Sequence, residues 1–154
     1  MHDTIPRRTT TPCAATVQLD DGSRLDVTFW LLPDSHRERG VTPMRVLLEE
    51  DRRFLPIGLA GGGSCLLSRD AIVSVAIEAD GPGAEPTPPE GAALDLVTLH
   101  LVSGEEVSGV LTTTALEGHG RMSDVFNLAG RFVPVGVGAQ LVFVATSRIA
   151  RVSF

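Results

Sequence analysis

The sequence has no lysine, no tyrosine and few aromatic residues: one tryptophan and six phenylalanines among 154 residues. Because surfaces that bind single-stranded nucleic acid by base stacking need exposed aromatic side chains, this composition argues against such a surface. The chain has two cysteines, Cys13 and Cys65, without C-x-x-C spacing, which argues against a disulfide-stabilised secreted scaffold. No apolar run approaches the roughly 20 residues of a membrane-spanning helix.

Positive charge is also scarce, and the net charge is −6. Binding to a phosphate backbone depends on an excess of positive charge, so nucleic acid is disfavoured as a partner. Arg7 and Arg8 lie near the start, but no apolar segment of signal-peptide length follows them. We therefore expect a cytoplasmic protein that has no membrane partner.

No pattern indicates catalysis or metal binding. The four histidines form neither an i, i+4 pair nor a Cys/His cluster. The glycine-rich stretch "GLAGGGSC" at 58–65 lacks the Gly-Lys-Ser/Thr end of a phosphate-binding loop, and the chain has no nucleophile elbow. We expect a protein that is not an enzyme and that has no cofactor and no metal.

The clearest feature that is present is an internal repeat. "ATVQLDDG" at 15–22 matches "VTLHLVSG" at 97–104, and both alternate apolar and polar residues up to a glycine turn, as half-buried strands do. The ungapped windows 45–58 and 123–136 are identical at four of fourteen positions: Arg53/Arg131, Phe54/Phe132, Pro56/Pro134 and Gly58/Gly136. The pattern predicts two similar small folds.

The repeat divides the chain. We predict a flexible arm at 1–14, a first β-barrel at 15–78, a linker rich in Pro, Gly and acid at 79–95, and a second β-barrel at 96–154. Each barrel is expected to have about five strands and one short helical turn. Pro56 and Pro134 cannot donate to a ladder, so each is expected at a strand end, an edge or a bulge.

The second half contains, in order, a strand that ends at Gly104, then Asp124 and Asn127, then "FVP", and finally the closing "SRIARV". In these features it resembles the Sm-like group of small, SH3-type β-barrels. It is also similar to uncharacterised bacterial proteins with an R-x-S-D-x-x-N segment followed by F-x-P. The resemblance implies two tandem Sm-like barrels, a fold that commonly extends its sheet by edge pairing. It does not carry RNA binding over, because "ATSRIARV" lacks the Arg-Gly pair of the family's RNA pocket.

One polar cluster is particular to the second copy: Arg121, Ser123, Asp124 and Asn127, with Arg131 close behind. These residues could form a pocket for a nucleotide or another anion. They could equally belong to a short helix, with Ser123 as its N-cap, Asp124 in its first turn and Gly130 as the glycine that ends it. The first copy keeps the helical pattern but not the polar residues, which favours the second interpretation.

The run "FWLL" at 29–32 has four consecutive apolar residues, so we predict a protein interface at Phe29, Trp30 and Leu31. The leading functional hypothesis is an interaction or scaffolding module whose partner is itself or another protein, reached through sheet edges. A sensor of a small ligand that uses the polar cluster is the alternative, and an RNA-binding protein is the third.

Overall fold

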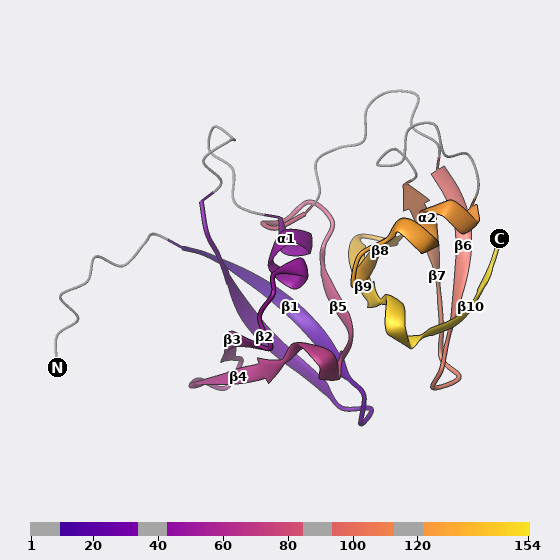
Figure 1. Ribbon diagram of the computed structural model, residues 1–154. Coiled ribbons are helices and arrows are strands. Elements are labelled where there is room, and N and C mark those ends of the chain that lie inside the picture. The colour runs from indigo at the N-terminus through magenta and orange to yellow at the C-terminus, as the bar shows by residue number, and fades with distance from the viewer. Residues whose placement is uncertain (1–9, 34–42, 85–93, 113–121) are drawn as a thin grey trace, which may run out of the picture.

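The computed structural model describes residues 10–33, 43–84, 94–112 and 122–154 (Figure 1). The first half contains β1 (Thr11–Leu19), β2 (Arg24–Leu31), α1 (Met44–Glu49), β3 (Phe54–Leu59), β4 (Ser64–Ser68), the short 3-10 helix η1 (Arg69–Ala71) and β5 (Ile72–Glu78). The second half repeats this order with β6 (Leu94–Leu101), β7 (Glu106–Thr112), α2 (Met122–Leu128), β8 (Phe132–Val137), β9 (Gln140–Ala145), the 3-10 helix η3 (Thr146–Arg148) and β10 (Ile149–Ser153).

The all-β prediction is confirmed, but the strands form one continuous sheet that is not closed. Its ten antiparallel strands lie in the order β10-β6-β7-β8-β9-β5-β1-β2-β3-β4. Each half contributes five neighbouring strands, and the ladder between β5 and β9 joins the halves. Within the described residues β4 does not pair with β5, nor β9 with β10, so neither half closes on its own strands.

The two halves are built with the same turns. The amide of Gly22 donates to the Leu19 carbonyl and that of Gly104 donates to the Leu101 carbonyl, each over 2.9 Å. Both glycines have positive φ, 88° and 95°, which is why a glycine stands at each turn. The amides that open η1 and η3 also make matching bonds of 2.9 Å, from Arg69 to the Arg53 carbonyl and from Thr146 to the Arg131 carbonyl.

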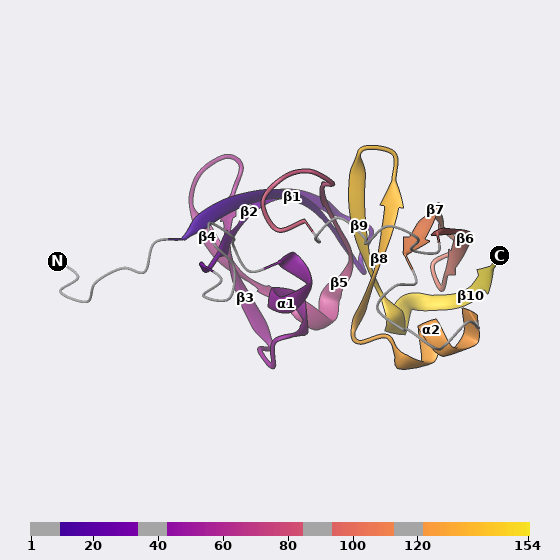
Figure 2. The ribbon, with the colours of Figure 1, turned by 90° about the horizontal axis from the view of Figure 1, so that it is seen from above.

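Each half also has its own hydrophobic core. The first is built around Phe29, Leu48 and Val75, and the second around Leu99, Leu111 and Val135. Figure 2 shows the halves side by side, with the sheet curling around α1 in the first half and α2 lying beside the second. The division is incomplete, because Phe132 and Phe143 of the second half belong to the first core.

The two prolines lie inside strands, where the ladder on one side stops. Pro56 pairs with Leu66 of β4, and β2 pairs with β3 only at Val27↔Leu59 and Thr28↔Gly58. Pro134 is placed in the same way, because β7 pairs with β8 only at Val110↔Gly136. Each proline therefore pairs with a strand on one side only. This agrees with the expectation that a residue without an N–H lies where a ladder stops.

The ends of the predicted segments differ from the structure. Thr11 to Ala14, predicted as part of the arm, are in β1, where they pair with β2 residues Thr28 to Leu31. Leu94 and Asp95, predicted as linker, begin β6. The Ala79 amide donates to the Ala139 carbonyl of the second half over 2.9 Å, whereas Pro82 and Gly83 contact the first half: the Met44 amide donates to the Gly83 carbonyl over 2.8 Å. The remainder of the linker and residues 1–9 lie outside the described residues.

Candidate functional site

The predicted polar cluster lies mainly on α2. Ser123 and Asn127 are exposed and Asp124 is half-buried, while Arg121 lies outside the described residues. The helix begins at Met122, so Ser123 lies within its first turn and the prediction of an N-cap at Ser123 is wrong. Asp124 is in the first turn, as predicted. No hydrogen bond or ion pair joins these three side chains to another described residue.

Arg131 is directed to the first half of the chain. Its Nη2 lies 3.6 Å from Oδ1 of Asp51, a fully exposed carboxylate. Its backbone amide and that of Phe132 each donate to the Glu49 carboxylate over 3.0 Å. The structure thus connects Arg131 with the end of α1 rather than with the polar residues of α2.

Gly130 is present for a different reason from the one predicted. It is not among the described glycines with positive φ, so it is not a left-handed glycine that ends the helix. A Cβ at this position would lie 2.6 Å from both carboxylate oxygens of Glu49. Glycine therefore lets the Glu49 carboxylate reach the two amides, and this contact holds α1 against the start of β8.

We expect Glu49→Ala to lower the free energy of unfolding by about 2 kcal/mol, because two hydrogen bonds to a charged group are lost and two amides lose their partner. Urea denaturation measures the change. The matched control is Glu50→Ala, which removes an exposed ion pair with Arg52, the one that Glu50 makes with a described residue, and should cost about 1 kcal/mol or less. Equal losses in the two variants would show that the Glu49 contact does not hold the halves together.

Two of the three predicted interface residues are not at the surface. Phe29 and Leu31 are buried in the first core, and their neighbours Trp30 and Leu32 point outward. The alternation of a half-buried strand continues through "FWLL", so the prediction is wrong for Phe29 and Leu31. Trp30 is 47% exposed, and its ring lies over Gly58 of the adjacent strand β3.

The ladder between β5 and β9 is the principal junction between the halves. It pairs Ser74 to Glu78 with Val144 to Gln140, and Val75 and Phe143, which face each other in it, are fully buried. Side chains next to the ladder add polar contacts. Gln18 Nε2 donates to Glu105 Oε1 over 2.6 Å, and Arg148 Nη2 donates to Asp20 Oδ2 over 3.2 Å.

This junction uses the last strand of the first half and the next-to-last strand of the second. The strands left at the outer edges are β4, the next-to-last strand of the first half, and β10, the last strand of the second half. The ladders within each half define which residues correspond. Leu66 faces Pro56 as Phe143 faces Pro134, so Leu66 corresponds to Phe143. Val152 faces Leu99 as Val75 faces Val17, so Val152 corresponds to Val75.

Apolar residues at the outer edges are exposed where their counterparts at the internal junction are buried. Leu66 is 66% exposed, whereas Phe143 is 0% exposed. Phe154, directly after β10, is 83% exposed, whereas its counterpart Ile77 is 2% exposed. Val152, the counterpart of Val75, is partly buried in the second core, so Leu66 and Phe154 are the edge residues that an added strand would cover.

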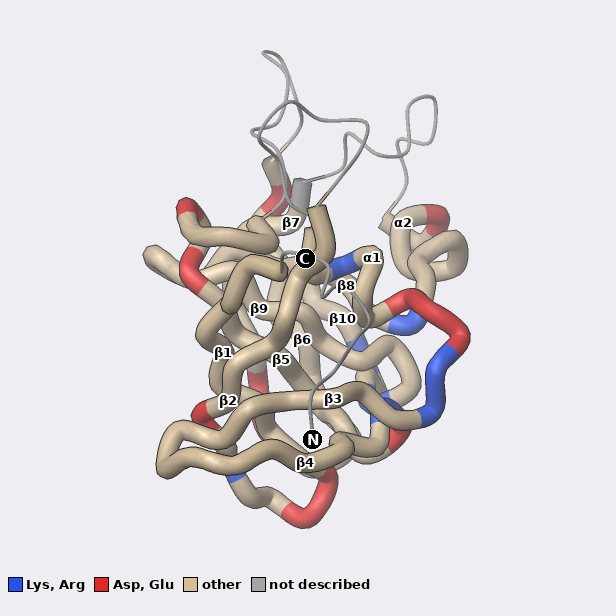
Figure 3. Tube along the Cα trace, turned by 90° about the vertical axis from the view of Figure 1, so that its left-hand side faces the viewer, with Lys and Arg blue, Asp and Glu red and all other residues tan. Residues whose placement is uncertain are grey.

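Strand β4 contains neither a charged residue nor a proline, two of the features that normally protect an edge. Neither β4 ("SCLLS") nor its neighbour β3 contains a charged residue, and both are uncharged along their length in Figure 3. Sheet edges in soluble proteins are usually protected by charge, proline or a covering segment. This edge was not predicted from the sequence, although aligning "SCLLS" with the buried "LVFVA" of β9 would have indicated it.

The described residues contain no group of three or more His, Cys, Asp or Glu that could hold a metal ion. None of the helices in this part of the chain is long and apolar enough to cross a membrane. The two thiols differ: Cys65 is exposed on β4, and burial raises the pKa of the Cys13 thiol, which donates to the Pro82 carbonyl over 3.0 Å.

Comparison with known proteins adds no family to these observations. The chain matches no described protein family, no curated protein and no solved structure.

Proposed function

We propose that this protein is a non-enzymatic, cytoplasmic scaffolding module made of two Sm-like repeats, each an open barrel completed by a strand from outside it, and that it assembles with copies of itself. In the assembly β10 of one chain pairs with β4 of the next. The observation that carries the proposal is the internal ladder, because β5 and β9 correspond to β10 and β4. The same pairing that joins the halves would therefore join successive chains.

The internal ladder also predicts the register between chains. Val75↔Phe143 becomes Val152 facing Leu66 of the next chain, and Ala76↔Val142 becomes Ser153 facing Cys65. Burial of Leu66 and Phe154 would supply the apolar contribution, at about 25 cal/mol for each Å² removed from water. The backbone groups on the open sides of β4 and β10 would gain hydrogen-bond partners.

A contact between two different edges is heterologous, so repeated addition makes a closed ring or an open filament. One polar contact of the internal junction, that of Arg148 with Asp20, is not repeated between chains, because Val102, which is exposed, occupies the position of Asp20. We therefore expect the contact between chains to be the more apolar of the two. Such a contact weakens less at high salt concentration.

The register can be tested with one added cysteine. In an antiparallel ladder, facing Cα atoms are about 4.5–5.5 Å apart, within the range that a disulfide spans. Ser153→Cys should therefore give a ladder of disulfide-linked species on a non-reducing gel after mild oxidation, through native Cys65 of the next chain. Buried Cys13 should not react. The protein without the substitution should sediment at multiples of 16.3 kDa.

Two controls define the result. Ser153→Cys combined with Cys65→Ser should give only a background of disulfides between two introduced thiols. Arg151→Cys, which is two positions out of register with Cys65, should cross-link far less than Ser153→Cys. Equal cross-linking by Arg151→Cys would contradict the register. A strict monomer at high protein concentration, with no cross-linking of Ser153→Cys above the controls, would contradict self-association.

A further inference from the structure

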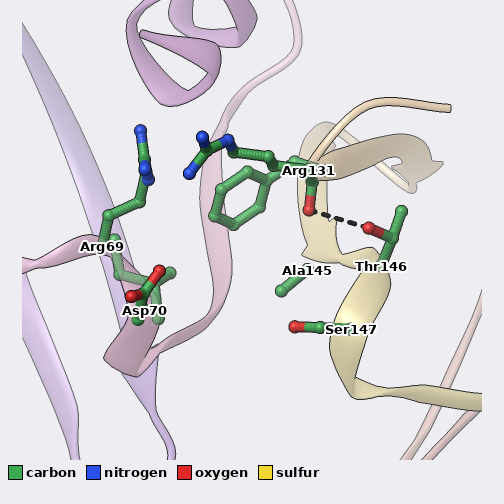
Figure 4. Close-up of a pocket in the computed structure, with 8 residues that line it drawn as sticks. Arg69, Asp70, Arg131, Ala145, Thr146 and Ser147 are labelled. Carbon is green, nitrogen blue, oxygen red and sulfur yellow. Dashed lines mark hydrogen bonds between the residues drawn. The ribbon is translucent and has the colours of Figure 1, made fainter. Parts of the chain in front are cut away.

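A hollow of about 270 Å³ lies where the two halves meet, on the side of the sheet that carries η1 and η3 (Figure 4). The first half contributes Arg69 and Asp70 from η1, and the second half contributes Arg131, Phe132 and the first residues of η3. The polar cluster predicted from the sequence shares only Arg131 with this hollow. The hollow therefore represents a separate candidate site.

Arg69 is the unusual residue of the hollow. It is 6% exposed, and its Nη1 donates to the Glu50 carbonyl at the end of α1. Its Nε is buried without a hydrogen-bond partner, and no carboxylate forms an ion pair with its guanidinium in the described part of the chain. A buried charge is costly unless it is paired with an opposite charge, and the described residues supply no counter-ion to this guanidinium.

The second cation of the hollow is Arg131. Figure 4 shows its side chain extending toward Arg69. Its one described ion pair is the 3.6 Å contact with Asp51, whose side chain is fully exposed, and such pairs contribute little. Two guanidinium groups thus approach one hollow. Asp70 also lines it, and the Glu49 carboxylate nearby accepts from the backbone amides of Arg131 and Phe132.

The remaining polar groups limit what the hollow can accept. The Thr146 hydroxyl already donates to the Gly130 carbonyl over 3.0 Å, whereas the exposed Ser147 hydroxyl has no hydrogen bond to a described residue. Asp70 is exposed, so its carboxylate adds negative charge at the rim. One small oxyanion suits this arrangement better than an extended polyanion.

We propose that the hollow binds a small ligand through a phosphate or carboxylate group held between Arg69 and Arg131. The planar guanidinium group pairs with both oxyanions through two parallel N–H···O bonds. The ligand would neutralise the charge of Arg69 and connect the two halves. This site lies within one chain, so it does not depend on the proposed pairing between chains.

The experiment is isothermal titration of the full chain with inorganic phosphate and, separately, with acetate, in sodium chloride at constant ionic strength. We expect at least one anion to bind in preference to chloride. Arg131→Gln should raise its dissociation constant at least about tenfold, because hydrogen bonds to charged groups are lost. The matched control is Arg53→Gln, because Arg53 corresponds to Arg131 but does not line the hollow. It should bind as the unsubstituted chain does.

The two anions distinguish the chemistry: binding of phosphate alone indicates a phosphorylated ligand, and binding of acetate indicates a carboxylate. Arg69→Gln should also lose anion binding, provided that circular dichroism shows it to be folded. If it is not folded, the affinity of Arg131→Gln alone tests the proposed site. Absence of binding by both anions at millimolar concentrations would overturn the proposal. Equal affinities of Arg131→Gln and Arg53→Gln would also overturn it.

Discussion

Replacing Phe143 with alanine is expected to lower the free energy of unfolding by roughly 3–5 kcal/mol, the usual cost of removing a buried phenylalanine side chain. Phe143 lies on β9, faces Val75 across the junction and is fully buried in the core of the first half. The cavity would therefore open in one half although the substitution is in the other. Urea denaturation monitored by the fluorescence of Trp30, which is in the first half, would detect the effect.

The matched control is Leu66→Ala, at the corresponding position of the outer edge. At low protein concentration it should change the free energy of unfolding by about 0.5 kcal/mol or less, as exposed substitutions do. At high concentration it should weaken self-association, because Leu66 is expected to face Val152 of the next chain. Equal destabilisation of dilute protein by both substitutions would contradict the difference between a buried Phe143 at the junction and an exposed Leu66 at the outer edge.

Local patterns in the sequence were sufficient for much of the fold. The alternation in "ATVQLDD" and "VTLHLVS" and the glycines that follow predicted β1, β6 and their turns, because a half-buried strand and a positive φ each demand particular residues. "FWLL" was misread, because an apolar residue on the outer face does not break a strand's alternation. Trp30 is such a residue, and half its surface is exposed.

The junction could not be predicted from local patterns. Strand periodicity shows which face of β5 or β9 is buried, but it does not identify the strand that lies alongside. The contacts of Glu49 with the amides of Arg131 and Phe132 join residues 82 and 83 positions apart, and no motif marks them. The hollow was missed because its two arginines, Arg69 and Arg131, lie in different copies and no motif connects them.

Gly109→Ala is the second substitution for which we expect a large effect. Gly109 lies on β7, where a Cβ would collide with the carbonyl oxygen of Gly136 and lie 2.6 Å from Cγ1 of Val135. Since the first obstacle is backbone, no side-chain rotation can relieve it, and β7 must move away from β8. We expect a loss of about 3 kcal/mol in the free energy of unfolding, at the upper end of the usual cost of overpacking.

The control for this substitution lies on the facing strand. A Cβ on Gly136 would meet no atom closer than the Val110 carbonyl oxygen at 3.6 Å, an ordinary contact, and Gly136 is not among the described glycines with positive φ. Gly136→Ala should therefore be neutral or stabilise by up to about 1 kcal/mol, through the lower entropy of the unfolded chain. Urea denaturation of both variants tests the close approach of β7 and β8. Since β7 and β8 share only the Val110↔Gly136 pair, tolerance of Gly109→Ala would mean that these strands can separate without loss of the second core.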